Sequence, residues 1–291
     1  MSNRLRVWAP VLIAAGLACA ATAADDKPPR MPEYGKESPP PPRTRAEVHA
    51  VLAGAPPTTA APRPLHIVLV AGPKDHGRGE HDYPAWQKVW AKLLGTARDV
   101  SVSTAWEWPS AEQLKTGDVF IFYQKGDWTP QRARDTDAAL ARGAGLVYLH
   151  FAVDGQKDAP GFAQRIGLSW QDGQSKYRHG VVDLDFGTAR HPIARNFGKV
   201  RFVDETYWRL AGDPKRLNPI ASGKEEGTSW PLFWTLEPDK GRVFVTLLGH
   251  YAWTFDDPLF RVLVLRGIAW SAKEPVDRFN DLVWPGARVA D

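Results

Sequence analysis

The sequence predicts an α/β protein with a doubly wound, mostly parallel sheet in a three-layer α/β/α arrangement. Short, continuous apolar runs, typical of strands that are covered on both faces, alternate with segments of helical periodicity. Between residues 65 and 151 these segments follow one another as β-α-β-α-β-α-β, an order that gives parallel strands with right-handed crossovers. The 291 residues, of which 43% are hydrophobic, suffice for the core of one large domain or two small ones.

Residues 1–24 are interpreted as a secretory signal peptide. Arg4 and Arg6 precede an apolar run over residues 7–18, and Ala21-Thr-Ala23 provides a small-residue cleavage pattern. The run is too short for a permanent membrane helix, and no later stretch reaches the about 20 apolar residues that a span needs. We therefore expect a periplasmic or secreted protein without an integral membrane span.

Cys19 is the only cysteine of the chain. Cleavage after Ala23 would remove it, so disulfides, cysteine-ligated zinc and a cysteine nucleophile are all excluded from the mature protein. The alternative is that Gly16-Leu-Ala-Cys19 serves as a lipoprotein signal, although Gly16 stands where leucine is usual. Cys19 would then be a lipidated N-terminus.

Residues 25–63 are rich in proline, which favours extended backbone and prevents regular ladders. We interpret this segment as a disordered tether with one short helix at Arg45 to Ala53. Residues 64–273 form the predicted α/β domain, and residues 274–291 form a C-terminal extension.

The elements of the domain follow from its apolar pattern. In the first half, strands are predicted at 65–70, 99–105, 118–123 and 145–151, and helices at 84–94 and 129–140, with Pro84 and Pro130 at helix starts. In the second half, strands are predicted at 181–186, 219–222, 231–236 and 242–248, and a long helix begins at Pro258. Residues 202–208 carry two adjacent acids, Asp204 and Glu205. We find no internal repeat.

The charge balance argues against nucleic acid as a partner. The chain has 37 Lys and Arg against 33 Asp and Glu, a formal charge of +4. This surplus is dispersed and forms no basic stripe that could neutralise a phosphate backbone.

The loop after the first predicted strand carries two histidines, His76 and His81, between glycines. A loop at the carboxyl end of a buried parallel strand is where open α/β proteins place their ligands. Its glycines, at positions 72, 77 and 79, match neither G-x-x-x-x-G-K-[ST] nor G-x-G-x-x-G. We therefore expect no nucleotide cofactor.

His76, His150 and His250 each lie just past a different predicted strand. If those strands are parallel neighbours, their carboxyl ends converge and the imidazoles share one crevice. Glu205 or Asp204 could complete a His/carboxylate set that binds zinc with one position open. The alternative is that each histidine is a hydrogen-bonded strand-end residue, that His81 is a solvated loop residue, and that Asp204 and Glu205 are an exposed acidic pair.

Tryptophans in polar loops could bind the flat faces of sugar rings. Trp128 and Trp253 fall near the predicted crevice, whereas Trp86, Trp90 and Trp270 follow a helical period that is typical of core positions.

Several motifs together resemble the ThuA-like (trehalose utilisation) family. They are Lys74-Asp-His-Gly-x-Gly-Glu-His-Asp-Tyr83, Gly143-Ala-Gly-Leu-Val-Tyr-Leu-His150, His191-Pro-Ile193, Asp204-Glu-Thr-Tyr207, Gly241-Arg-Val-Phe-Val-Thr-Leu-Leu-Gly-His250 and Pro258-x-Phe260. The resemblance covers roughly residues 64–273 and implies a flavodoxin-like sheet of the class I glutamine amidotransferase-like superfamily. It also implies a link to the catabolism of sugars, particularly 3-keto glycosides.

The resemblance carries the family's recurrent polar residues onto His76, His150, Asp204, Glu205 and His250. Glutamine amidotransferases hold a cysteine at a sharp strand-to-helix elbow, where this chain has Leu149-His150-Phe151-Ala152. Glutamine hydrolysis by that mechanism is therefore excluded.

Our leading hypothesis is an exported sugar-processing enzyme. His76, His150, Glu205 and His250 would be catalytic and would bind a divalent metal, with zinc the first candidate, or act as an acid/base set. The expected carbohydrate-binding residues are Asp75, His81, Tyr83, Trp128, Asp204 and Trp253. The alternatives are a non-catalytic carbohydrate-binding module on a degenerate amidotransferase-like fold and a metal-dependent hydrolase unrelated to sugar. The sequence leaves the oligomeric state open.

Overall fold

The structure, a computed structural model, describes residues 37–56, 62–187 and 190–291. The predicted signal peptide and Cys19 lie outside these residues. Within the described ranges, no helix combines the length and the apolar character that a membrane span requires.

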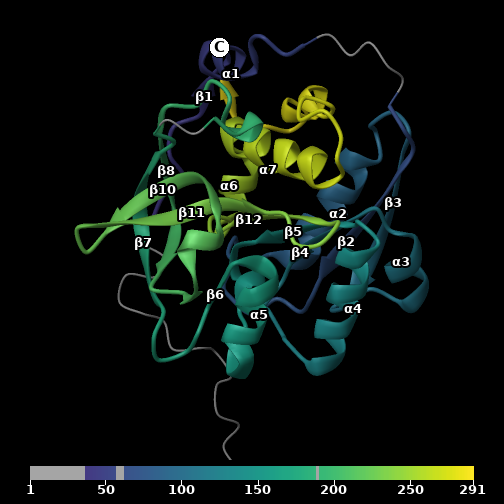
Figure 1. Ribbon diagram of the computed structural model, residues 1–291. Coiled ribbons are helices and arrows are strands. Elements are labelled where there is room, and N and C mark those ends of the chain that lie inside the picture. Colours follow the sequence, from purple (N-terminus) through teal and green to yellow (C-terminus); the bar gives the residue numbers. More distant parts are fainter. Residues whose placement is uncertain (1–36, 57–61, 188–189) are drawn as a thin grey trace, which may run out of the picture.

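The centre of the fold is a nine-stranded sheet of order β3-β2-β4-β5-β12-β11-β10-β7-β8 (Figure 1). Its parallel half consists of β2 (Leu65–Ala71), β3 (Val100–Trp106), β4 (Val119–Tyr123), β5 (Gly145–Leu149) and β12 (Arg242–Thr246). Numbered along the chain, these five strands stand in the order 2-1-3-4-5, the flavodoxin-like arrangement. The prediction of a doubly wound parallel sheet is confirmed for this half.

The other half of the sheet is antiparallel, so the prediction of a mostly parallel sheet is wrong there. It consists of β11 (Thr228–Leu236), β10 (Asn218–Glu225), β7 (Lys176–Asp185) and β8 (Lys199–Trp208). For β10 and β11 the reason is the length of the connection, since only Glu226 and Gly227 separate them. Parallel neighbours need a crossover of a dozen or more residues, whereas a short turn joins antiparallel strands.

Helices cover both faces of the parallel half (Figure 1). On one face lie α2 (Tyr83–Leu94), α6 (Ala252–Asp256) and α7 (Pro258–Ser271), and on the other α3 (Ala111–Thr116), α4 (Pro130–Ala141) and α5 (Ala159–Ile166). The helices α3 and α5 were not predicted, because they have six and eight residues and give little periodicity. Asp257 caps α7 through a bond from the Leu259 N–H to its Oδ1 at 2.9 Å, as its place before Pro258 suggests.

Short elements connect the larger ones. They are the two-stranded pair β6 (Leu168–Ser169) and β9 (Ala211–Gly212) and the 3₁₀ turns η1 (His150–Val153), η2 (Gln156–Asp158), η3 (Pro192–Ala194), η4 (Pro214–Arg216) and η5 (Asn280–Val283).

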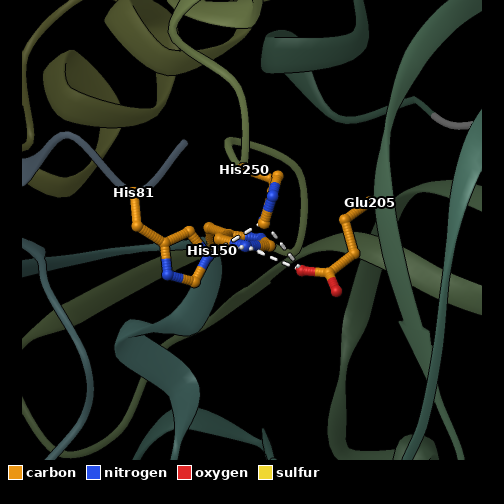
Figure 2. Close-up of side chains that lie close together, drawn as sticks. All are labelled: His81, His150, Glu205 and His250. Carbon is orange, nitrogen blue, oxygen red and sulfur yellow. Dashed lines mark hydrogen bonds and ion pairs between the residues drawn. The ribbon is translucent and has the colours of Figure 1, made fainter. Parts of the chain in front are cut away.

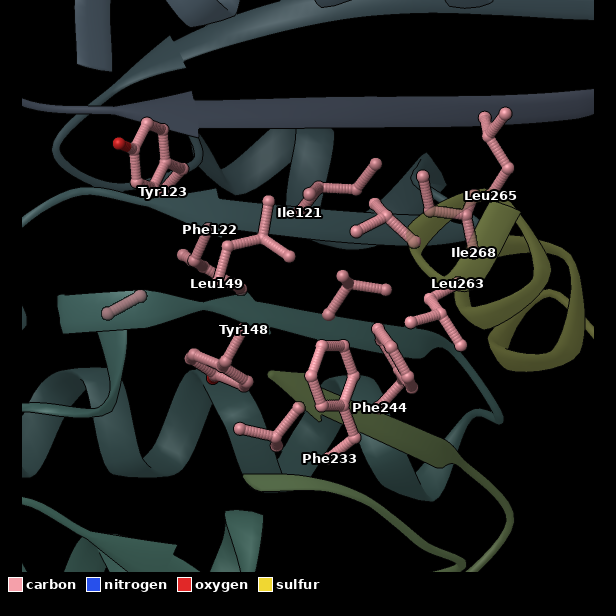
Figure 3. Close-up of a cluster of buried hydrophobic side chains, with 14 of the residues drawn as sticks. Ile121, Phe122, Tyr123, Tyr148, Leu149, Phe233, Phe244, Leu263, Leu265 and Ile268 are labelled. Carbon is pink, nitrogen blue, oxygen red and sulfur yellow. The ribbon is translucent and has the colours of Figure 1, made fainter. Parts of the chain in front are cut away.

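The core lies where α7 packs on the parallel strands. Every residue of α7 is buried, and Leu263, Leu265 and Ile268 face the side chains of β4 and β5 in Figure 3. Helix and sheet approach closely at Gly267, where an added Cβ would lie 2.4 Å from the Phe244 ring. The parallel strands are therefore closely packed against α7 on this face of the sheet.

The N-terminal segment differs from the predicted tether. Residues 43–52 form β1 (Arg43–Thr44) and α1 (Arg45–Leu52), and β1 pairs in parallel with β13 (Val289–Ala290). Thr44 and Glu47 form a reciprocal capping box, and Val48 is fully buried. The short helix predicted here is confirmed, but these residues pack on the domain and are not a disordered tether.

Two buried arginines of α7, here called the arginine pair, hold the terminal segments. Arg266 donates to the carbonyls of Val51 at 3.0 Å and Arg195 at 2.8 Å. Arg261 donates to the carbonyls of Phe255, Pro285 and Gly286. Both side chains are almost completely buried, and their guanidinium groups tie residues from both ends of the chain to the core.

Candidate functional site: a buried histidine and glutamate cluster

Four polar side chains converge at the carboxyl edge of the parallel strands (Figure 2). They are His81, His150, Glu205 and His250, here called the ligand quartet, and their candidate ligand atoms all lie within 4.8 Å of one another. His81 belongs to the loop after β2, His150 follows β5, and His250 follows β12. All four side chains are buried. The convergence of strand-end histidines with Glu205 follows the placement expected at this edge of an open sheet.

The quartet contains His81 where the sequence analysis placed His76. The ring centroids of His76 and His81 are 3.8 Å apart, so the two residues are neighbours. The His76 side chain keeps 20% of its accessible surface, whereas His81 keeps 1%. His76 therefore lies on the solvent side of the quartet.

The contacts within the quartet are short. His81 Nε2 lies 2.8 Å from His150 Nε2 and 3.0 Å from His250 Nδ1. Glu205 Oε2 lies 3.1 Å from both His150 Nε2 and His250 Nδ1. In Figure 2 these rings and the carboxylate point toward one another.

The hydrogen bonds made by Nδ1 of His81 and His150 determine whether their Nε2 atoms carry a hydrogen or a lone pair. His81 Nδ1 lies 2.9 Å from Asp75 Oδ1, and His150 Nδ1 lies 2.8 Å from the Leu247 carbonyl. A carboxylate and a carbonyl can only accept, so both Nδ1 atoms carry hydrogens. In the neutral rings both Nε2 atoms then present lone pairs to each other at 2.8 Å. Two facing lone pairs repel unless a cation or a proton lies between them.

Glu205 is held from both sides. Its Oε2 accepts from Tyr207 Oη at 2.8 Å, and its Oε1 lies 3.3 Å from His179 Nε2. Tyr207 stands two residues after Glu205 on β8 and therefore on the same face of the strand. His179 is opposite Glu205 in the β7–β8 register.

The environment sets the charge of the quartet. Burial lowers the pKa of His81 well below its usual range and that of His250 to about 4. Burial alone would raise the pKa of Glu205, but the charge of His250 and the close contacts of the carboxylate with His150, His179 and His250 outweigh it and hold that pKa well below normal. A neutral imidazole and an ionised carboxylate are the forms that bind metal.

His179, beside the quartet, shifts the other way. Burial would lower its pKa, yet the hydrogen bond to Glu205 and the charge of that carboxylate outweigh burial and raise the pKa of His179.

The backbone is strained at two quartet residues. His81 has φ of 40° and His150 has φ of 54°, in the left-handed region that side chains rarely adopt. His150 turns the chain from β5 into η1, the elbow at which the sequence analysis noted histidine in place of cysteine. Such strain costs about 1–3 kcal/mol and clusters at functional sites.

Asp75 connects the quartet to its solvent side. Its Oδ1 accepts from His81 Nδ1 and from His76 Nδ1, each at 2.9 Å, and Tyr83 Oη lies 2.7 Å from His81 Nδ1. Burial alone would raise the pKa of Asp75, but these two histidines hold it well below its usual range. Asp75, His81 and Tyr83, expected to bind substrate, thus lie at the site, with His81 as a ligand candidate.

Asp204 supports the site through the backbone. It is fully buried and accepts from the N–H groups of Glu205, Gly249 and His250 at 2.7–2.9 Å. Burial raises its pKa. Asp204 holds the loop that presents His250, a different role from the substrate contact that was expected.

Neither expected tryptophan contacts the quartet in the described contacts. Trp128 stacks on Phe162 of α5 with a centroid distance of 4.3 Å. Trp253 stacks on Tyr251 at 4.0 Å and donates to the Val203 carbonyl at 2.9 Å.

Sequence reasoning missed three residues around the quartet: Tyr207, His179 and Tyr251. Tyr207 could have been found from its i+2 spacing to Glu205 if residues 202–208 had been predicted as a strand. His179 depends on the pairing of β7 with β8, which spacing in the sequence does not reveal.

The quartet fits a divalent metal. Ligand atoms at about 2.0–2.2 Å from a tetrahedral zinc ion stand roughly 3.3 Å apart. Four of the contacts here are close to that value, at 2.8–3.1 Å, and all candidate ligand atoms lie within 4.8 Å of one another. The bonds from His81 to Asp75 and from His150 to Leu247 are those by which metal-binding histidines are oriented. The donor set, three imidazoles and a carboxylate, could therefore hold a metal ion.

Comparisons with known proteins agree with this architecture. The family model described as ThuA, trehalose utilisation, matches residues 68–271. A ThuA-like protein from Parabacteroides merdae ATCC 43184 is 21% identical, with a TM-score of 0.58 over 72% of this chain and 90% of that one. A ThuA-like protein from Bacteroides uniformis ATCC 8492 is 17% identical, with a TM-score of 0.59 over 77% of this chain and 99% of that one.

These two structures support the fold alone, and the comparison with curated proteins gives no match. The family match, however, extends over most of the chain, from β2 to the end of α7, and includes every residue of the quartet. The chain therefore belongs to the ThuA family.

Proposed function

We propose that the protein is an exported sugar-processing enzyme whose ligand quartet binds a divalent metal, with zinc the first candidate. The observation that carries the proposal is the pair of lone-pair-bearing Nε2 atoms of His81 and His150, 2.8 Å apart and beside an ionised Glu205. This set of donors is unfavourable when empty and is relieved by a cation.

Sugars are the proposed substrate class, with glycosides and 3-keto glycosides first. The support is the family description, trehalose utilisation. Export rests on the N-terminal pattern of residues 1–24.

The surrounding residues suggest how the site would work. A metal bound here would supply Lewis-acid polarisation of a carbonyl or hydroxyl oxygen of the sugar. His76 lies on the solvent side, is oriented by Asp75, and would move a proton to or from the carbon next to the polarised carbonyl carbon. Tyr207 and His179 would keep the Glu205 carboxylate in place. The result would be elimination, hydration or isomerisation of a keto sugar.

A non-catalytic carbohydrate-binding module is the second candidate, and one observation favours it. No quartet residue exposes more than 4% of its surface, whereas catalytic zinc sites keep a position open to substrate. A closed metal centre would then only stabilise the fold that binds sugar.

Turnover separates the two candidates. Purified protein would be analysed for bound metal and assayed on glycosides and 3-keto glycosides before and after removal of the metal by a chelator. An enzyme is expected to convert a substrate and to lose that activity with its metal. Binding of sugar without turnover, unchanged by the chelator, would reject the enzyme in favour of the binding module.

A further inference from the structure

Tyr251 links the quartet to the segment that precedes α1. It follows His250, and its backbone forms an isolated bridge with Glu80 in the loop that carries His81. Its hydroxyl lies 3.1 Å from Glu37 Oε2 and 2.9 Å from His179 Nδ1. His179 in turn reaches Glu205 Oε1 at 3.3 Å.

The direction of these hydrogen bonds follows from Glu37. A carboxylate can only accept, so the Tyr251 hydroxyl donates its hydrogen to Glu37. The hydroxyl oxygen then accepts from the Nδ1–H of His179, which fixes the tilt of that ring. His179 Nε2 is thereby aimed at Glu205 Oε1, which leaves Glu205 Oε2 for the quartet.

The segment that carries Glu37 is anchored at several points. The Pro40 carbonyl accepts from Arg288, and Arg43 Nε donates to Asp257 Oδ2 at 2.8 Å. The next two contacts are those of β1 with β13. Because these contacts are distributed from Pro40 to Thr44, residues 37–44 are held against the domain beside Tyr251. These residues, here called the N-terminal strap, lie outside the 68–271 range of the family match.

We propose that the N-terminal strap is part of the metal site, with Glu37 acting through Tyr251 and His179 as a positioning residue for Glu205. The proposal rests on the proposed metal-binding function. It assigns to a segment outside the family domain an influence on metal affinity that passes through Tyr251 and His179.

The test is a double-mutant cycle read as metal affinity. Zinc dissociation constants would be measured by competition with a chromophoric chelator for the full chain, Glu37→Ala, Tyr251→Phe and the double variant. Loss of an outer-shell partner typically weakens metal binding about 10- to 100-fold. We expect Tyr251→Phe to fall in that range, Glu37→Ala near its lower end, and the double variant to be no weaker than the weaker single variant, because both act along one chain of bonds.

Two further variants separate positioning from folding. Glu37→Gln keeps an oxygen that accepts from Tyr251, so it should restore most of the affinity lost in Glu37→Ala. Glu47→Gln is the matched control in the adjacent helix α1, since glutamine maintains a capping box, and it should leave affinity unchanged. Unchanged affinity in Glu37→Ala, or effects of Glu37→Ala and Tyr251→Phe that multiply, would overturn the proposal.

A metal-free measurement keeps the proposal separate from the proposed function. If the wild-type protein binds no metal, the proposed function fails, and the strap is then judged by ¹⁵N NMR of His179. The Nδ1 atom should be protonated in the wild type, and its signal should shift in both Tyr251→Phe and Glu37→Ala. An identical His179 signal in all three proteins would refute the positioning role proposed for the N-terminal strap.

Discussion

Two buried polar clusters in this protein differ in where their hydrogen bonds end. The guanidinium groups of the arginine pair, Arg261 and Arg266, donate outward to backbone carbonyls of six other residues. In the ligand quartet, His81 and His150 also donate outward, through Nδ1, to Asp75 and to the Leu247 carbonyl, but they present their Nε2 acceptors inward, to each other.

The difference separates a structural cluster from a binding site. Donors that meet acceptors stabilise a fold without any further component, because an unsatisfied buried group would cost about 1–3 kcal/mol. Acceptors that meet acceptors leave a place for a cation. Burial alone does not distinguish the two clusters, since both are almost inaccessible to solvent.

The largest expected effect is loss of metal from His150→Ala. Removing a ligand should weaken metal binding by more than the about 10- to 100-fold typical of an outer-shell partner, and metal-dependent turnover should fall with it. The fold loses the bond to Leu247, worth about 0.5–1.5 kcal/mol. Chelator competition and thermal melting on the same samples measure both quantities. His66→Ala, at the opposite end of β2, is the matched control, and equal metal loss in it would contradict the assignment.

Arg266→Ala should show the reverse pattern. It leaves buried carbonyls of Val51, Ile193 and Arg195 without their donor, so the free energy of unfolding should fall by about 3–5 kcal/mol. Metal affinity should be unchanged. Denaturant titration measures the loss, and Arg201→Ala, which breaks an exposed ion pair with Asp183, should cost no more than about 1 kcal/mol. If Arg266→Ala lost metal at temperatures where the protein is folded, the arginine pair would contribute to metal binding, and the distinction between the two clusters would fail.

Added zinc should stabilise the protein through the quartet only. At a free concentration of 100 times the dissociation constant, binding to the folded state alone adds about 2.7 kcal/mol. Differential scanning calorimetry should show a rise in melting temperature for the wild type and for Arg266→Ala, and none for His150→Ala. A similar rise in His150→Ala would place the metal elsewhere.

The smallest expected effect is a pH dependence of the free energy of unfolding through His191, which lies two residues before Ile193, a partner of Arg266. His191, at the start of η3, has its pKa lowered by burial from 6.5 to about 4. The unfolded chain therefore binds more protons than the folded chain between these values, and stability is lost as pH falls from about 6.5 to 4. Solvent screens the half-exposed ring, so we expect about 1 kcal/mol. Denaturant titrations should show a shallower acid loss in His191→Gln than in the wild type, and parallel curves would contradict the assignment.

The parallel half of the fold could be predicted because its strands are continuous apolar runs, such as Phe120-Ile-Phe122 in β4. His150 and His250 could be predicted as site residues for the same reason, since each ends such a run. In the antiparallel half, β7 ends in alternating buried and exposed positions rather than a continuous apolar run, and the pairing partners depend on turns such as Glu226-Gly227. The partner of Glu205, His179, was therefore missed.

The choice between His76 and His81 could not be made from the sequence. Both lie in one glycine-containing loop, and the backbone N–H of His81 is bound by the His250 carbonyl at 2.9 Å. That contact joins residues far apart in the chain and turns His81 inward. The packing of α1 on the domain could not be predicted either, because the proline content around it is typical of an extended segment.

The pairing of β1 with β13 has a consequence for folding kinetics. It joins residues 43–44 to residues 289–290, nearly the full length of the described chain, and contacts of such separation carry a large loop-closure entropy. The strands that present the quartet are joined by shorter connections and should assemble earlier. Refolding followed by a zinc-sensitive dye should therefore show a weakly binding species before the high-affinity one, and a single phase would show that the strap and the quartet form together.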